Sequence, residues 1–170
     1  IRTEKSANRR IFKPMKRLLL LLVIVAFVRP LDAQTLTGEE IAHQWNRCII
    51  EVIMEDGFGP PIAARIHAYS NLAGYQAAFR AEPGYRSMVG MLNGFAACPE
   101  PKKDLTYDWR VSAVAAYQVA CSKLLYRTGI SDSLARVQFD RLSKEVSAEV
   151  FTRSKDYGIE VGKAINAYAK

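Results

Sequence analysis

The chain has 170 residues and a formal net charge of +7. Residues 1–33 hold eight basic and two acidic side chains, whereas residues 34–170 are close to neutral, with a net charge of +1. Sequence-independent binding of nucleic acid needs a concentrated basic surface, so the near-neutral body of the chain excludes a nucleic acid as partner.

Residues 15–33 have the order of a secretory signal peptide. A short positive start at 15–17 precedes eleven uninterrupted apolar residues at 18–28, and a more polar stretch ends at the small residue Ala33. Eleven helical residues span about 16 Å, against roughly 30 Å of hydrocarbon in a bilayer, so we expect no stable membrane span. Cleavage after Ala33 predicts a mature protein that begins at Gln34 and is exported to the periplasm or out of the cell.

Residues 1–14 precede the first methionine, and they are polar and without a pattern. We predict that they are upstream sequence and not part of the native protein. The alternative is an unusually long positive region of the signal. In either case residues 34–170 form the body of the protein.

Three cysteines follow the predicted cleavage site: Cys48, Cys98 and Cys121. The odd number leaves at least one of them unpaired within a monomer, and the sequence does not fix a disulfide pairing. Because the sequence has no CxxC motif and no Cys/His cluster, we expect no zinc site. Cys48 and Cys121 fall on apolar helix faces and are predicted to be buried, inert thiols, whereas Cys98 falls in a loop between prolines.

The first predicted helix covers residues 37–56. Thr37 and Glu40 form a capping box at its start, and Gly57 suits a left-handed cap at its end. Apolar residues at helical spacing predict one buried face, made of Ile41, Trp45, Cys48, Ile49, Val52 and Ile53.

The second predicted helix begins at Pro60-Pro61, where prolines are tolerated in the first turn, and runs to about residue 79. It is rich in alanine, glycine and serine, which let neighbouring helices approach closely. We therefore predict that it is the central, largely buried helix. Its main apolar stripe consists of Ile62, Ile66, Tyr69 and Ala73. A shorter helix is expected over residues 85–95.

The rest of the chain is predicted to hold a loop and three more helices. Two prolines make residues 96–108 a loop, and a third long helix covers 109–127. A fourth helix is capped by Ser131. It turns Leu134, Phe139, Leu142, Val146 and Val150 inward and places the ion pairs Arg136–Asp140 and Arg141–Glu145 outward. A last helix begins after Gly158. The predicted fold class is all-α, a bundle of about five to six helices.

The two histidines are the first candidates for chemistry. His43 and Glu39 could supply two ligands to a metal ion, but nothing specifies a third, so we predict a surface histidine. His67 is predicted to be a hydrogen-bonded histidine between helices and not a general base. Residues 57–59 begin like a glycine-rich loop, yet two prolines follow, which predicts a turn. The sequence therefore assigns no catalytic, cofactor-binding or metal-binding residue to this chain.

Several short motifs occur in a fixed order along the chain. They are Trp45-Asn46 and Glu51, residues 57–61, Ala64-Arg65, Ala68-Tyr69, Leu72-Ala73, Tyr75-Gln76-Ala77, Tyr107-Asp108-Trp109, Tyr157-Gly158, Val161-Gly162 and Ala164-Ile165. In this order they resemble the amino-terminal helices of bacterial exported proteins of the type 2 phosphatidic acid phosphatase and vanadium-dependent haloperoxidase superfamily. The likeness covers most of residues 38–170.

The resemblance implies chemistry at a bound oxyanion. In that family a lysine, two arginines and serine–glycine amides neutralise phosphate or vanadate, while one histidine attacks phosphorus or ligates vanadium and another acts as general acid. The signatures are Lys followed by Arg-Pro, then Pro-Ser-Gly-His, then Ser-Arg followed by His. The sequence has a single Arg-Pro, Arg29-Pro30 in the predicted signal, and neither of the other two signatures. No catalytic residue is carried over, and vanadate or phosphate would belong to the full-length protein.

We therefore expect residues 34–170 to be the amino-terminal helical part of a phosphatase-like or haloperoxidase-like domain. Its partner would be the catalytic half of the same protein, which would follow Lys170. A homo-oligomer is also possible from the sequence. The other hypothesis is a complete small helical binding protein of the cell envelope. The substrate, and the choice between phosphatase and haloperoxidase, stay open.

Overall fold

The computed structural model describes residues 35–170, so the predicted upstream segment 1–14 and signal peptide 15–33 lie outside the described residues. Within 35–170 the chain is all-α, as predicted. Its elements are α2 (Gly38–Asp56), α3 (Pro60–Ala78), the short 3-10 helix η1 (Phe79–Ala81), α4 (Trp109–Leu124), α5 (Gly129–Leu142) and α6 (Ala148–Tyr168). In this described part no helix is long and apolar enough to cross a membrane.

Helix α2 forms over the predicted residues, but with only the Thr37 half of the predicted capping box, because the Glu40 carboxylate accepts from the Gln44 side chain at 3.0 Å instead. The Thr37 hydroxyl accepts a hydrogen bond from the Glu40 amide at 3.1 Å, and Gly57 ends the helix in the left-handed region with φ of 69°. The helix buries one face against the bundle, consisting of Ile41, Trp45, Cys48, Ile49 and Val52. Local capping and helical periodicity therefore determine this element from end to end.

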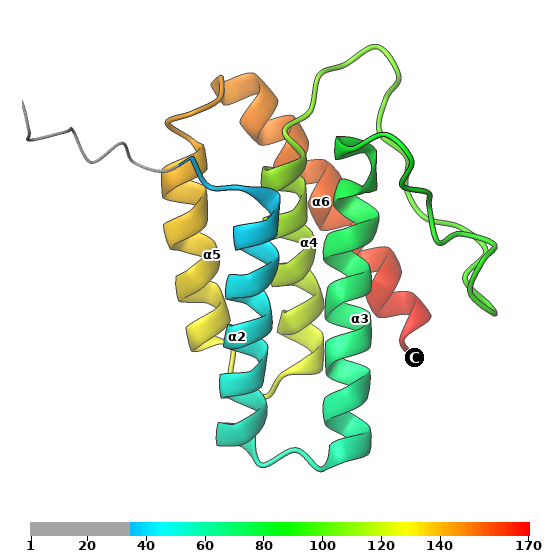
Figure 1. The fold of residues 1–170 in the computed structure, drawn as a ribbon, viewed down its shortest axis with the longest axis vertical. Helices are drawn as coiled ribbons and strands as arrows, with labels where there is room; N and C mark the ends of the chain where they lie inside the picture. Colours follow the sequence, from blue (N-terminus) through cyan, green and yellow to red (C-terminus); the bar gives the residue numbers. More distant parts are fainter. Residues whose placement is uncertain (1–34) are drawn as a thin grey trace, which may run out of the picture. The chain divides into compact units, whose positions relative to one another are not determined.

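The central helix is α4, not α3. Helix α4 packs against α2, α3, α5 and α6, as Figure 1 shows, and nine of its residues are buried. The prediction that residues 61–79 form the central helix is wrong, because α3 lies at the edge of the bundle with one face turned outward. Ile62, placed in the predicted apolar stripe, is 51% exposed. Alanine-rich composition fits both helices, so it could not distinguish between them.

Helix α6 runs without a break through Gly158, so the predicted start after this residue is wrong. A Cβ atom at Gly158 would lie 2.2 Å from the Ser112 carbonyl oxygen, and one at Gly162 would lie 2.7 Å from the Val119 Cβ. The two glycines therefore let α6 lie against the backbone of α4. Ser147 caps this helix, where its hydroxyl accepts from the Val150 amide at 3.4 Å.

Two more predicted boundaries are wrong. Helix α4 ends at Leu124 and not at residue 127, because the Asp56 carboxylate accepts hydrogen bonds from the amides of Tyr126 and Arg127 at 3.3 Å each. Helix α5 begins at Gly129, two residues before the predicted cap Ser131. The Ser131 hydroxyl instead donates to the Thr128 carbonyl at 2.9 Å from a buried position.

Residues 85–95 form turns and not the short helix that the sequence predicted. Gly84, Gly90 and Gly94 have φ of 97°, 74° and 77°, a region that breaks a right-handed helix. The segment is attached to α3 by Gln76, whose side-chain oxygen accepts from the Met88 amide at 3.1 Å. Side-chain contacts of this kind replace a regular backbone hydrogen-bond pattern here.

Candidate functional site

A groove of about 900 Å³ lies between the start of α2, the end of α3 with η1, and the start of α4. Its walls combine aromatic and small side chains with a few polar ones. They are Thr37, Gly38, Glu39, Ile41, Ala42, Asn71, Gly74, Tyr75, Ala78, Phe79, Ala81, Glu82, Tyr85, Trp109, Arg110, Ala113 and Tyr117. The groove exists because glycine and alanine occupy positions where larger side chains would fill the space between the helices.

Tyr117 and Gly74 are two buried residues of the groove wall. A Cβ atom at Gly74 would lie 2.1 Å from the Tyr117 ring, so only glycine lets the ring cross α3 at this point. The ring stacks on Trp45 with centroids 5.1 Å apart, and its hydroxyl donates to the Asn71 side-chain oxygen at 3.0 Å. Burial raises the pKa of Tyr117 to about 12, so the hydroxyl remains a protonated donor into the alkaline range.

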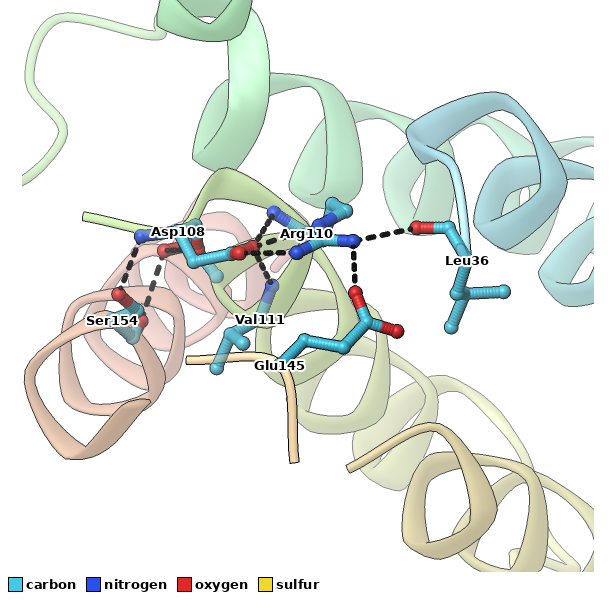
Figure 2. A network of polar contacts seen from close by, with 7 residues as sticks. Leu36, Asp108, Arg110, Val111, Glu145 and Ser154 are labelled. Carbon is cyan, nitrogen blue, oxygen red and sulfur yellow. Dashed lines mark hydrogen bonds and ion pairs between the residues drawn. The ribbon is translucent and has the colours of Figure 1, made fainter. Parts of the chain in front are cut away.

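Arg110 lies in the groove wall, and Figure 2 shows its polar contacts. The guanidinium contacts the Asp108 carboxylate at 2.6 Å and the Glu145 carboxylate at 2.7 Å. Its Nη1 also donates to the Leu36 carbonyl at 3.1 Å. The hydrogen bonds to Asp108, which have the largest effect, and to Glu145 raise the pKa of Arg110. They outweigh burial, which lowers it. The cation therefore joins three segments that are far apart in the sequence.

Asp108 itself fixes the start of α4. Its carboxylate accepts from the amides of Arg110 at 2.9 Å and Val111 at 3.3 Å, and its own amide donates to the Ser154 hydroxyl at 2.8 Å (Figure 2). The predicted outward pair between Arg141 and Glu145 is replaced, because Glu145 lies beyond the end of α5 and reaches Arg110. This network is a structural junction in which two carboxylates contact one guanidinium, so its formal net charge is negative.

A vanadate or phosphate group does not fit this groove. An oxyanion needs converging cations with free hydrogen-bond donors, whereas the Arg110 guanidinium donates to two carboxylates and a backbone carbonyl. The two other charged residues of the walls, Glu39 and Glu82, are acidic. The electrostatic field of the groove therefore opposes an anion.

The predicted surface position of His43 is confirmed, whereas the predicted hydrogen bond of the His67 imidazole is not found among the described residues. His43 is on the surface, with its Nε2 3.5 Å from the Glu39 carboxylate. His67 is half-buried on α3, and its carbonyl oxygen accepts from the Asn71 side chain at 3.0 Å. Residues 57–59 form the turn between α2 and α3. Among residues 35–170 no three His, Cys, Asp or Glu side chains gather closely enough to hold a metal ion.

The polar partners inside the bundle did not follow from the sequence patterns. The Trp45 indole donates to the Gln138 side-chain oxygen at 2.9 Å, and the Gln138 amide donates to the Gln44 side-chain oxygen at 2.8 Å. Gln138 is buried on the same face of α5 as Leu142. The pairing could be anticipated only from the rule that a buried tryptophan N–H needs an acceptor.

The residues that carry the family resemblance have structural roles in this fold. Trp45 lies in the core, Asn46 exchanges hydrogen bonds with Asn71 at 2.9 and 3.2 Å, and Asp108 caps α4. Gly158 lies against the backbone of α4. The resemblance is therefore one of packing and capping, and it does not extend to reacting groups in the described residues.

The three thiols differ in exposure: Cys48 and Cys121 are buried, as predicted, and Cys98 is partly exposed. Burial, with a contribution from Glu100, raises the pKa of Cys98 to about 11, and burial raises the pKa of Cys48 to about 11. Because only the thiolate reacts, access to reagent decides the order of labelling. We expect Cys98 to be alkylated first in the native protein, with a rate that rises about tenfold per pH unit between pH 7 and 10.

Peptide mapping after timed treatment with iodoacetamide checks this order, and Cys98→Ser should abolish the early label. Equal labelling of all three cysteines, or a disulfide between Cys98 and Cys121, would contradict the prediction.

The fold is similar to the crystal structure of a bacterial vanadium-dependent iodoperoxidase, with a TM-score of 0.69 and 29% sequence identity. The similarity covers 76% of this chain but 32% of that protein, so this chain spans about a third of the length of its structural relative. No protein-family model and no curated protein matches the sequence. The structural likeness supports the relationship to the haloperoxidase-like superfamily that the order of motifs indicated.

Proposed function

We propose that residues 34–170 are the amino-terminal helical portion of a haloperoxidase-like or acid-phosphatase-like protein, whose catalytic motifs lie in polypeptide that follows Lys170. One observation carries the proposal: the described helices match a vanadium-dependent iodoperoxidase over 76% of this chain and 32% of that protein. The order of the motifs from Trp45 to Ile165 supports the same conclusion.

In this proposal the chain supplies a rigid scaffold. Its helices are joined by buried hydrogen bonds such as Trp45 to Gln138, and by the Arg110 junction between α4, residue 36 and Glu145. Networks of this kind fix one arrangement of the helices. A catalytic portion that packs on the scaffold would then have its cations and histidines held in place, as stabilisation of an oxyanion requires.

Export is part of the proposal. The charged and apolar order of residues 15–33 supports cleavage after Ala33 and a mature protein in the periplasm or outside the cell. Amino-terminal sequencing of the secreted protein should find Gln34 as the first residue. A mature protein that keeps residues 18–28 would contradict this part alone.

The groove favours a second candidate, a small helical binding protein of the cell envelope. A concave site of about 900 Å³ has the size of a ligand pocket. The coding sequence after Lys170 distinguishes the two candidates. Arg-Pro, Ser-Gly-His and Arg…His signatures in an open frame would favour the enzyme, and a stop codon would favour the binding protein.

Activity provides the direct test. We expect purified residues 34–170 to oxidise no iodide in the presence of vanadate and hydrogen peroxide, and to hydrolyse no phosphate ester, because Arg110 is engaged by carboxylates. The longer product with the three signatures should show one of these activities. Activity of residues 34–170 alone, inhibited by Asp108→Ala or Arg110→Ala, would overturn the proposal.

A further inference from the structure

The walls of the groove offer aromatic faces and few free hydrogen-bond donors. Asn71 is saturated: its oxygen accepts from Asn46 and Tyr117, and its nitrogen donates to Asn46 and His67. The Tyr75 hydroxyl donates to the Arg86 carbonyl at 2.8 Å. A ligand would therefore be held by surface contact and charge and not by a network of hydrogen bonds.

Three aromatic side chains of the groove form a group. Tyr75 packs against Phe79 with centroids 6.4 Å apart and against Tyr85 at 6.2 Å. Trp109, at the start of α4, instead stacks on Tyr107 with centroids 5.6 Å apart. Tyr85 is 60% exposed, so much of its ring has no neighbour among residues 35–170. Aromatic faces carry negative charge density and attract cations within about 6 Å.

The same attraction already operates at the edge of the groove. The Arg80 guanidinium lies 5.0 Å from the centre of the Phe79 ring and is paired with Glu100 at 3.3 Å. Arg80 is not part of the groove wall. It shows that the aromatic group can be combined with a cation and a carboxylate in this fold.

The charges of the groove are predominantly acidic. Its walls contain Glu39, Glu82 and Arg110, and the Arg110 charge is opposed by Asp108 and Glu145. Four carboxylates therefore act against one guanidinium. The Glu39 side chain is 85% exposed and Glu82 is also exposed, so these charges attract a cation and repel an anion through solvent and are screened by salt.

From this combination we infer that the groove binds a small organic cation with an aromatic or branched apolar body, such as an arylalkyl ammonium compound. The apolar body would lie on Ala78, Ala113 and the aromatic rings, and the ammonium group would lie toward Glu39 and Glu82. The volume of about 900 Å³ suits a ligand of this class. The inference goes beyond the proposed function, because it needs neither the catalytic motifs nor polypeptide after Lys170.

The test compares three fluorescent probes on the purified protein. Dansylcadaverine has an aromatic body and an ammonium group, its N-acetyl derivative has the same body without the charge, and anilinonaphthalene sulfonate has an aromatic body with a negative charge. We expect dansylcadaverine to bind at least tenfold more tightly than the other two in fluorescence titrations, with the difference reduced at high salt.

Substitutions in the groove test whether dansylcadaverine binds there. Ala78→Trp should fill it and weaken binding of dansylcadaverine at least tenfold, whereas Ala64→Trp, on the exposed face of α3, should leave binding unchanged. The double variant Glu39→Gln, Glu82→Gln should weaken binding of the ammonium probe about threefold or more and leave the acetylated probe unaffected. Glu51→Gln, an exposed position of α2 outside the groove, is the matched control.

Circular dichroism verifies that Ala78→Trp is folded, and Tyr85→Ala at an exposed position replaces it if it is not. Equal binding of the three probes, preference for the sulfonate, or no binding of dansylcadaverine at millimolar concentration would overturn the inference. Binding of dansylcadaverine that the groove variants leave unchanged would also overturn the inference. A change of oligomeric state in these variants, without any binding of the probe, would overturn it as well. None of these results bears on the proposed catalytic portion.

Discussion

Replacement of Gly158 by alanine is expected to lower the free energy of unfolding by about 2–3 kcal/mol. The added Cβ would lie 2.2 Å from the Ser112 carbonyl oxygen and 2.8 Å from the Ala115 Cβ. Both atoms belong to a rigid helix and not to the end of a flexible side chain, so α4 and α6 must move apart. At an open position within a helix, replacement of glycine by alanine would raise the free energy of unfolding by up to about 1 kcal/mol. The sign of the change at Gly158 therefore shows whether α6 approaches α4 closely.

Gly38→Ala is the matched control. No atom lies within 4 Å of a Cβ at this position in the first turn of α2, so we expect a change smaller than about 1 kcal/mol. Urea unfolding followed by circular dichroism measures both variants. If Gly158→Ala proved as stable as the parent protein, the described contact between α4 and α6 would be incorrect.

Trp45→Ala is expected to cost about 4 kcal/mol of unfolding free energy. Trp45 is fully buried, stacks on Tyr117 and donates to Gln138. Truncation of a buried tryptophan removes its apolar contacts and leaves a cavity, which costs about 3–5 kcal/mol. It also leaves the Gln138 oxygen in a buried position without its indole partner, which adds to the loss.

A double-mutant cycle separates packing from hydrogen bonding at this site. Trp45→Phe keeps an aromatic ring and removes the donor, and Gln138→Leu removes the acceptor. We expect the double variant to lose less stability than the sum of the two single variants, by about 1 kcal/mol. Strict additivity in urea unfolding would show that the 2.9 Å contact contributes nothing.

The sequence predicts local features well and contacts between helices poorly. The cap at Thr37, the buried face of α2 and the all-α class follow from residues that are close together in the chain. Glycine is a poor helix former, which fits the predicted start of a helix after Gly158. The contact of Gly158 with Ser112 becomes visible only when α6 is placed on α4.

The groove could not be predicted for the same reason. It requires Gly74 and Ala78 of α3 to face Ala113 of α4, and nothing in the sequence sets that register. The pair between Arg110 and Glu145 spans 35 residues, and the local pattern favoured Arg141 as the partner of Glu145 instead. The chemistry of the site thus follows from tertiary structure. The sequence also placed Tyr85 and Glu145 on helices, whereas Tyr85 lies in an irregular segment and Glu145 lies beyond the end of α5.

The central place of α4 determines how the bundle opens. Because α4 touches all four other helices, its backbone amides cannot reach solvent unless most of the tertiary structure is lost. Deuterium exchange in the middle of α4 should therefore require global unfolding, and the protection there should report the whole stability of residues 36–170. The exposed first turns of α3 should exchange through local fraying, many orders of magnitude faster.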